Sequence, residues 1–155
     1  YLLMRDGRLQ IRDPRDGSLL AEWRYPAFNG FTLSPRGNLL AVGAEDDTIQ
    51  LWNFTQATLN DRLPGAGSHP AFSPDGMQLA AGSQDGRVLL WNLIDLTVVR
   101  GNSSHHDLVE DVAFSADGSI LYSVSVDSRV RFGEVRIWRS KNGYQFTRMS
   151  LPQIM

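Results

Sequence analysis

Three residues of the types that hydrolases use for acyl transfer lie in the C-terminal third of the chain. His105, Ser123 and Asp127 are a potential base, nucleophile and acid. In a catalytic triad the imidazole takes the serine proton and the carboxylate orients the imidazole. That chemistry requires a serine that substrate can reach. The elements that carry these residues therefore decide between a catalytic and a structural role.

A second candidate site is the pair His105-His106, which is followed by Asp107. Imidazole and carboxylate groups are common zinc ligands. Adjacent histidines in one loop rarely converge on a single ion, however, and the sequence shows no further cluster of ligands. We therefore expect no metal, no other cofactor and no catalytic residue in this chain.

Composition excludes several classes of protein. The chain has 155 residues, a formal net charge of -2, 42% hydrophobic residues and no cysteine. The lack of cysteine excludes a disulfide scaffold, a zinc ribbon and a thiol nucleophile. The arginines are scattered along a slightly acidic chain, and no apolar run approaches the roughly 18 residues that span a bilayer. We expect protein partners, no nucleic acid, no membrane, and an intracellular, cytoplasmic location.

A repeat of about 40 residues organises the sequence. Each copy has a turn segment, an apolar run, an acidic turn and a short alternating segment that ends in tryptophan. The turn segments are Leu-Ser-Pro-Arg-Gly37, Phe-Ser-Pro-Asp-Gly76 and Phe-Ser-Ala-Asp-Gly118, and the tryptophans are Trp52, Trp91 and Trp138. Trp52 and Trp91 are 39 residues apart, whereas Trp91 and Trp138 are 47 apart. An earlier partial copy has Arg12 in the tryptophan position.

This period predicts an all-β protein built from blades of a β-propeller, each a four-stranded antiparallel sheet. Asp-Gly pairs adopt the positive φ angles of tight hairpin turns, and the flanking segments are rich in Val, Ile, Leu and Phe. We expect residues 1–155 to form a single propeller segment of about three and a half blades. The predicted divisions are a partial blade at 1–25 and blades at 26–62, 63–101 and 102–155, the last with a loop insertion near 128–134.

The run from Phe72-Ser-Pro-Asp-Gly76 to Leu79-Ala-Ala-Gly-Ser-Gln-Asp-Gly-Arg-Val-Leu-Leu-Trp-Asn92 resembles the WD-repeat (WD40) family. The resemblance recurs in three full copies and one partial copy, and it implies a ring of about six to eight blades. Three arrangements would supply the missing blades. The chain is a segment of a longer polypeptide, two copies share one ring, or residues 151–155 complete a four-bladed ring. We favour the first arrangement.

The resemblance also implies a buried polar network in each blade, made of a His, a Ser or Thr, an Asp and the Trp. Blade four has all four members, namely His105, Ser123, Asp127 and Trp138. Blades two and three keep only Asp46 with Trp52 and Asp85 with Trp91, because Val42 and Ala81 take the serine position. Glu22 and Leu63 stand nine residues before Phe31 and Phe72, where the histidine is expected. We predict a structural rather than catalytic role for His105, Ser123 and Asp127, since Ser123 falls inside a strand.

The insertion in blade four is the predicted site of partner binding. It carries Arg129, Arg131 and Phe132, and arginine and aromatic residues are enriched at interface hot spots. The resemblance implies that this rim is the docking face, although a tolerated loop extension is the alternative. We predict a non-catalytic interaction scaffold. The alternatives are a propeller-based enzyme, a sensor domain whose active module lies outside these residues, and a nucleic-acid binder that uses the arginines.

Overall fold

The computed structural model describes residues 2–5, 8–24, 28–53, 56, 58–103, 105–127, 132–139 and 144–151. These residues form antiparallel strands grouped in four sheets, and the described part of the chain contains no helix. The all-β fold of four-stranded antiparallel blades is therefore confirmed. No helix of the described residues is long and apolar enough to cross a membrane.

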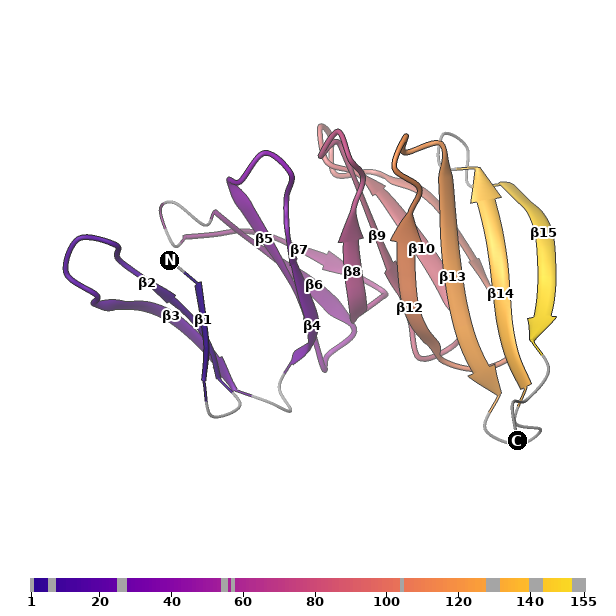
Figure 1. Ribbon diagram of the computed structural model, residues 1–155, viewed down its shortest axis with the longest axis horizontal. Helices are drawn as coiled ribbons and strands as arrows, with labels where there is room; N and C mark the ends of the chain where they lie inside the picture. Colours follow the sequence, from indigo (N-terminus) through magenta and orange to yellow (C-terminus); the bar gives the residue numbers. More distant parts are fainter. Residues whose placement is uncertain are drawn as a thin grey trace.

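Each sheet is contiguous in sequence, and the sheets follow one another across the molecule (Figure 1). Blade one has three strands, β1 (Leu2–Arg5), β2 (Arg8–Arg12) and β3 (Leu19–Arg24). Blade two comprises β4 (Phe28–Leu33), β5 (Leu39–Ala44), β6 (Thr48–Asn53) and β7 (Thr58–Pro64). Blade three comprises β8 (Ser68–Phe72), β9 (Gln78–Gly82), β10 (Arg87–Asn92) and β11 (Val98–Ser103). Blade four comprises β12 (Val109–Phe114), β13 (Ile120–Asp127), β14 (Phe132–Arg139) and β15 (Tyr144–Leu151).

The turn from the first to the second strand is the same in blades two, three and four. In blade three, Ser73 N–H donates to the Gln78 carbonyl and Gly76 N–H donates to the Ser73 carbonyl. Gly76 has a φ of 67°, and the glycines at the same place in blades two and four have a φ of 70°. A residue without a side chain suits this left-handed position. The Ser-Pro-Asp-Gly signal therefore fixes where each second strand begins.

The core lies between the faces of successive blades. Leu9 and Ile11 of β2 pack against β5 of blade two. Ile49 and Leu51, at the equivalent positions of β6, pack against blade three. Val88 and Leu90 of β10 in turn face Leu121 and Trp138 of blade four. Each fully buried aliphatic side chain contributes about 1.5–3 kcal/mol to folding, so one repeated pair of strand positions carries much of the stability.

Blade four departs from its expected strand boundaries. The third strand is expected to start at about Val135, but β14 starts at Phe132 and pairs with β13 as far as Asp127. The pairing thus continues into the insertion, because backbone groups at the end of a hairpin gain hydrogen bonds by extending the ladder. Phe132 to Glu134 therefore lie in a strand rather than in an open loop.

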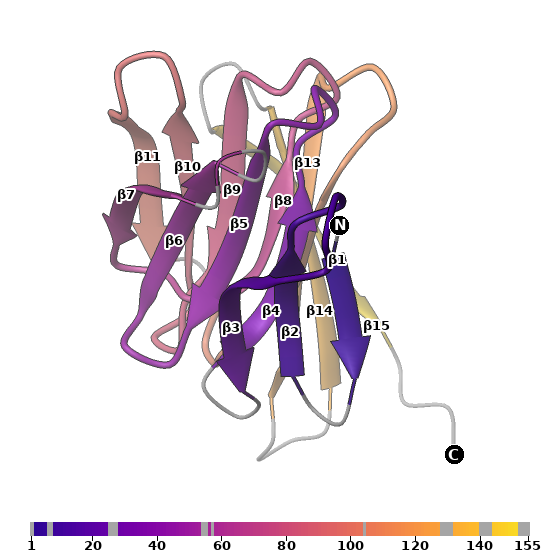
Figure 2. The same cartoon turned by 90° about the vertical axis from the view of Figure 1, so that its left-hand side faces the viewer.

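The two rims of the sheets differ in their connections. We call hairpin rim the end with the turns that join β8 to β9, β10 to β11 and β12 to β13, which lie together at the top of Figure 2. The opposite end, which we call the pocket rim, carries the turns from β5 to β6 and from β9 to β10 and the crossing from β7 to β8. The candidate sites below are distributed between these two rims.

Candidate functional site

A buried hydrogen-bonded cluster lies between β13, β14 and the segment before β12. His105 Nε2 lies 2.7 Å from Ser123 Oγ, and the Trp138 indole N–H donates to the same oxygen over 2.9 Å. Ser123 is completely buried, and His105 and Trp138 are nearly so. The structure therefore brings together three of the four residues predicted for blade four. Only the backbone of Asp127 is described, paired with Phe132.

The carboxylate beside His105 is that of Glu134, which the sequence analysis did not single out. Glu134 Oε2 lies 3.0 Å from His105 Nδ1, and its other oxygen accepts from Arg136 Nε over 3.0 Å. Glu134, Arg136 and Trp138 alternate along β14, so their side chains share one face of the sheet. The position four residues before a buried tryptophan on the same strand is the signal that points to Glu134.

Donor counting assigns the proton on a neutral His105 ring. Trp138 is a donor only, so Ser123 Oγ accepts from it and has its own hydroxyl proton to give. That proton goes to His105 Nε2, which leaves Nδ1–H to donate to Glu134. The hydrogen bonds thus link five side chains in series, namely Arg136, Glu134, His105, Ser123 and Trp138, and each of them has a partner. A network satisfied in this way rigidifies a buried site.

The cluster has the order acid, imidazole and serine of a triad, but its geometry is unfavourable for catalysis. Ser123 has no exposed surface and sits in the middle of β13. A nucleophilic serine oxygen must be free to approach a carbonyl carbon. The Ser123 oxygen instead accepts a hydrogen bond from the Trp138 N–H. In this arrangement Ser123 links two strands and a crossing segment.

Blade three fills the equivalent space with apolar groups. Ala81 stands where blade four has Ser123, and Leu89 stands where it has Arg136. Gly65 takes the place of His105. The Gly65 N–H donates to the carbonyl of Asp47, and the His105 N–H makes the same hydrogen bond to the carbonyl of Gly86. A Cβ on Gly65 would lie 3.1 Å from Leu89 Cδ1. The indole N–H of Trp91 is consequently left without a hydrogen-bond partner among the described residues.

Blade two uses a third solution. The Trp52 N–H donates to Gln50 Oε1, two residues earlier on β6, over 3.2 Å. The strand register also corrects the sequence alignment. Leu33 pairs with Leu40 as Phe72 pairs with Leu79, so Leu33 rather than Phe31 is the counterpart of Phe72. Both first strands have a register shift near their start, between Phe28 and Phe31 in β4 and between Ser68 and Ala71 in β8.

The acidic turn residues of blades two and three stabilise their own turns. Asp46 Oδ1 accepts from Thr48 Oγ1 over 2.6 Å. Asp85 accepts from the Ser83 hydroxyl and forms an ion pair with Arg87 at 2.7 Å. These hydrogen bonds lower the pKa of Asp85, with that from Arg87 the largest cause. In the first blade, Arg12 replaces the tryptophan and donates to Gln10 Oε1 and to the Gly17 carbonyl.

The remaining predicted residues give no assembled site. Arg129 and Arg131 lie outside the described residues, and only the backbone of Phe132 is described. His105 is buried whereas His106 is exposed, so the two imidazoles occupy different environments. The residues that the structure describes contain no group of three or more His, Cys, Asp or Glu side chains that could hold a metal ion.

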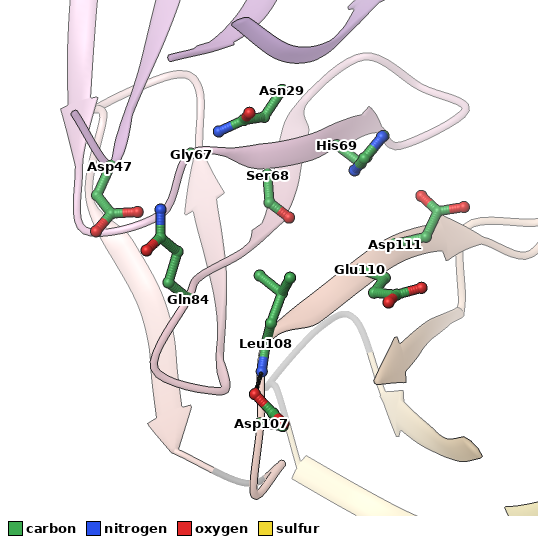
Figure 3. A pocket seen from close by; sticks show the side chains of 10 residues that line it. All are labelled: Asn29, Asp47, Gly67, Ser68, His69, Gln84, Asp107, Leu108, Glu110 and Asp111. Atoms are coloured by element: carbon green, nitrogen blue, oxygen red, sulfur yellow. Dashed lines mark hydrogen bonds between the residues drawn. The ribbon is translucent and has the colours of Figure 1, made fainter. Parts of the chain in front are cut away.

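A pocket of about 720 Å³ opens on the pocket rim and is lined by residues of blades two, three and four (Figure 3). Asn29 and Asp47 come from blade two, and Ser68, His69 and Gln84 come from blade three. Four lining residues are acidic and none is lysine or arginine; the acidic ones are Asp47, Asp107, Glu110 and Asp111. Arg87 lies near Asp47 but is paired with Asp85. Sequence spacing alone did not reveal this pocket, because its lining comes from three successive blades.

The chain is similar in fold to known WD40 structures. It matches the structure of U3-55K and the crystal structure of the RRP9 WD40 repeats, each with a TM-score of 0.71 and 22% sequence identity. Both matches cover 82% of this chain but only 40% and 39% of the respective structures. The chain thus spans about two fifths of their length. No curated protein matches it.

The family itself follows from the repeats. Residues 26–53, 68–92 and 96–132 match the model of the family described as WD domain, G-beta repeat. Together these stretches make up more than half of the chain, and they contain Trp52, Trp91 and the turns that join the first and second strands of blades two, three and four. The chain therefore belongs to the WD40 repeat family.

Proposed function

We propose that this chain is a non-catalytic scaffold that binds a protein partner, and that it forms part of a larger WD40 protein. WD40 repeat proteins generally act as protein-interaction scaffolds. The observation that carries the proposal is the pocket, because loops and strands from three blades contribute to it. A rigid scaffold that presents such a composite surface is suited to recognition.

The charge of the pocket indicates the kind of partner. Four carboxylates with no lysine or arginine among the lining residues favour a positively charged segment. Phosphate groups would be repelled, so the same feature argues against nucleic acid at this rim. We propose that a lysine or arginine side chain of the partner enters the pocket next to Glu110 and Asp111.

Affinity capture followed by mass spectrometry tests the scaffold proposal. The wild-type chain is compared with Glu110→Lys/Asp111→Lys, which reverses charge on the exposed part of β12. Asp16→Lys makes the same kind of change in an exposed turn on the hairpin rim and serves as the control. We expect the variant to lose a partner that the wild type and Asp16→Lys both retain. Identical capture by all three proteins would contradict the proposed site.

A second readout separates the scaffold from an enzyme. Ser123→Ala should lower the melting temperature, because it disrupts a buried network. If the chain carried a hydrolase activity dependent on Ser123, this variant would abolish turnover of an ester substrate that the wild type hydrolyses. The appearance of such an activity in the wild type and its loss in Ser123→Ala would refute the non-catalytic proposal.

A further inference from the structure

The turn between β10 and β11 lies on the hairpin rim (Figure 2). It carries large aliphatic side chains that are exposed to solvent. Ile94 is 77% exposed, Leu96 is 36% exposed and Met77, from the neighbouring turn, is 41% exposed. Leu93 N–H donates to the Met77 carbonyl over 2.9 Å, which ties the two turns together. These apolar groups therefore belong to one firmly held surface rather than to separate loops.

The corresponding turn of blade one provides an internal comparison. In both turns a backbone hydrogen bond from the first residue to the sixth closes the loop. Asp13 N–H donates to the Ser18 carbonyl and Asn92 N–H donates to the Thr97 carbonyl, each over 2.9 Å. The first side chain also caps the residue two positions later. Asp13 Oδ1 accepts from Arg15 N–H, and Asn92 Oδ1 accepts from Ile94 N–H. The two turns thus share a backbone design.

The two turns differ at two positions. Blade one has arginine at the exposed position, whereas blade three has Ile94. Blade one has Gly17 with a φ of 74°, whereas blade three has Leu96 with a φ of 57°. A branched aliphatic residue in the left-handed region is strained. An exposed isoleucine and a left-handed leucine are not the residues that the turn geometry itself favours. Strain of this kind is often retained at functional sites.

A groove lies directly beside the turn. Its volume is about 630 Å³, and it runs between blades three and four. Pro74, Met77, Ile94 and Gly118 line it together with polar residues of the adjoining turns. The lining thus combines apolar and polar residues, a composition typical of sites that take a side chain of a partner.

The charge on the groove is negative. Asp75 and Asp117 belong to the lining, which contains no lysine, arginine or histidine. Hydrogen bonds from the Ser115 hydroxyl and from Ser119 lower the pKa of Asp117 to about 2. A hydrogen bond from the Ser73 hydroxyl is the largest cause of the lowered pKa of Asp75, beside which Arg36 also lies. Both carboxylates are therefore ionised at neutral pH. Hydrogen bonds rather than a neighbouring cation lower the pKa of Asp117.

We propose that Ile94, Leu96 and the adjoining groove form a second docking site, for a protein segment that carries an aliphatic side chain beside a lysine or arginine. The aliphatic group packs on Met77 and Ile94, and the cation lies near Asp117. The inference rests on the proposed scaffold function, but it concerns the rim opposite the pocket. The two sites can therefore be tested independently.

Methyl NMR of the 155-residue chain tests the proposal. The chain has four methionines, and Met77 is the one that lines the groove, so its methyl resonance reports on the site. The probes are the synthetic peptides Gly-Ser-Arg-Leu-Arg-Ser-Gly, Gly-Ser-Arg-Ser-Arg-Ser-Gly and Gly-Ser-Glu-Leu-Glu-Ser-Gly. We expect the first peptide to shift the Met77 methyl at concentrations at least about tenfold below those that the other two require.

Three variants locate the binding. Ile94→Arg installs the residue type of blade one and should abolish the Met77 shift. Leu96→Gly should weaken it while keeping the melting temperature or raising it by roughly 2 °C, because strain is relieved. Glu110→Lys, on the pocket rim, should leave the shift unchanged.

Equal shifts with the Arg-Leu-Arg and Arg-Ser-Arg peptides, or an unchanged shift in Ile94→Arg, would overturn the proposal. A fall in melting temperature of several degrees in Leu96→Gly would also overturn it, because Leu96 would then serve the fold. The two proposals can fail separately. If the peptide shifts the Met77 methyl but partner capture does not depend on Glu110 and Asp111, this site is supported and only the pocket is refuted.

Discussion

Replacement of Ser123 by alanine should destabilise the chain by removing the centre of the blade-four network. The hydroxyl accepts from Trp138 and pairs with His105, so its loss leaves two buried polar groups without their partner. An unsatisfied buried donor or acceptor costs about 1–3 kcal/mol. The cavity left by the hydroxyl group adds little to this cost, because serine and alanine differ by one oxygen atom. We expect a loss of about 2–4 kcal/mol in the free energy of unfolding.

Urea unfolding followed by circular dichroism and tryptophan fluorescence measures this loss. The matched control is Ala81→Ser, at the equivalent position of blade three. It offers Trp91 an acceptor, but its own hydroxyl proton finds no imidazole there, so we expect a change within about 1 kcal/mol of zero. The contrast between the two positions isolates the contribution of the network from that of a strand serine.

Two results would refute this reasoning. A loss below about 0.5 kcal/mol in Ser123→Ala would show that the groups around Ser123 are satisfied without it. Equal effects of Ser123→Ala and His105→Ala, without coupling in the double variant, would show that the two side chains act separately. A network predicts strong coupling, since removal of either partner already disables the other.

Other perturbations test neighbouring features of the fold. Glu134→Gln should lower the melting temperature more than Asp127→Asn, because the Glu134 carboxylate contacts both His105 and Arg136; differential scanning calorimetry compares them, and the reverse order would return the acid role to Asp127. Gly82→Ala should cost about 1–3 kcal/mol in urea unfolding, because the new Cβ would lie 2.6 Å from the Val109 Cβ. Gly37→Ala, whose Cβ meets nothing within 4 Å but whose φ is 70°, measures separately the cost of a left-handed backbone without a clash. Asp117 has a folded pKa of about 2, below its ordinary value of about 3.9, so its stabilising effect is present above about pH 4 and is lost as the pH falls toward 2. Asp117→Asn should therefore make the midpoint of urea unfolding fall less steeply than that of the wild type as the pH is lowered from 4 to 2.

The fold was largely predictable because the repeated signals are local. The Ser-Pro-Asp-Gly turns and the tryptophans mark the ends of the strands, and these signals require no knowledge of distant contacts. The pairs Ile49 with Leu51 and Val88 with Leu90 then follow from strand alternation. Local chemistry and blade packing agree at these positions, so the pattern alone sufficed.

The candidate site was less predictable, because its partners are set by register rather than by spacing. The sequence predicts a loop for the extra residues of blade four, whereas the ladder runs on to Phe132 and places Glu134 in a strand. The pairing of Leu33 with Leu40 likewise identifies Leu33, and not Phe31, as the counterpart of Phe72. The pocket residues Asn29, His69 and Glu110 come together only when three blades pack, so no window of sequence contains them.

Blades three and four show why these networks must be recognised as sets of residues. Adding a histidine at Gly65 alone would press it against Leu89, and adding a serine at Ala81 alone would give it no imidazole. Leu89 and Arg136 occupy the same strand position, so one blade fills the space with an apolar side chain and the other with an ion pair. The orphan N–H of Trp91 is the remaining cost of the apolar solution. A tryptophan at the end of the third strand therefore identifies a blade, but only the residues two and four places before it on the strand reveal how that blade is held together.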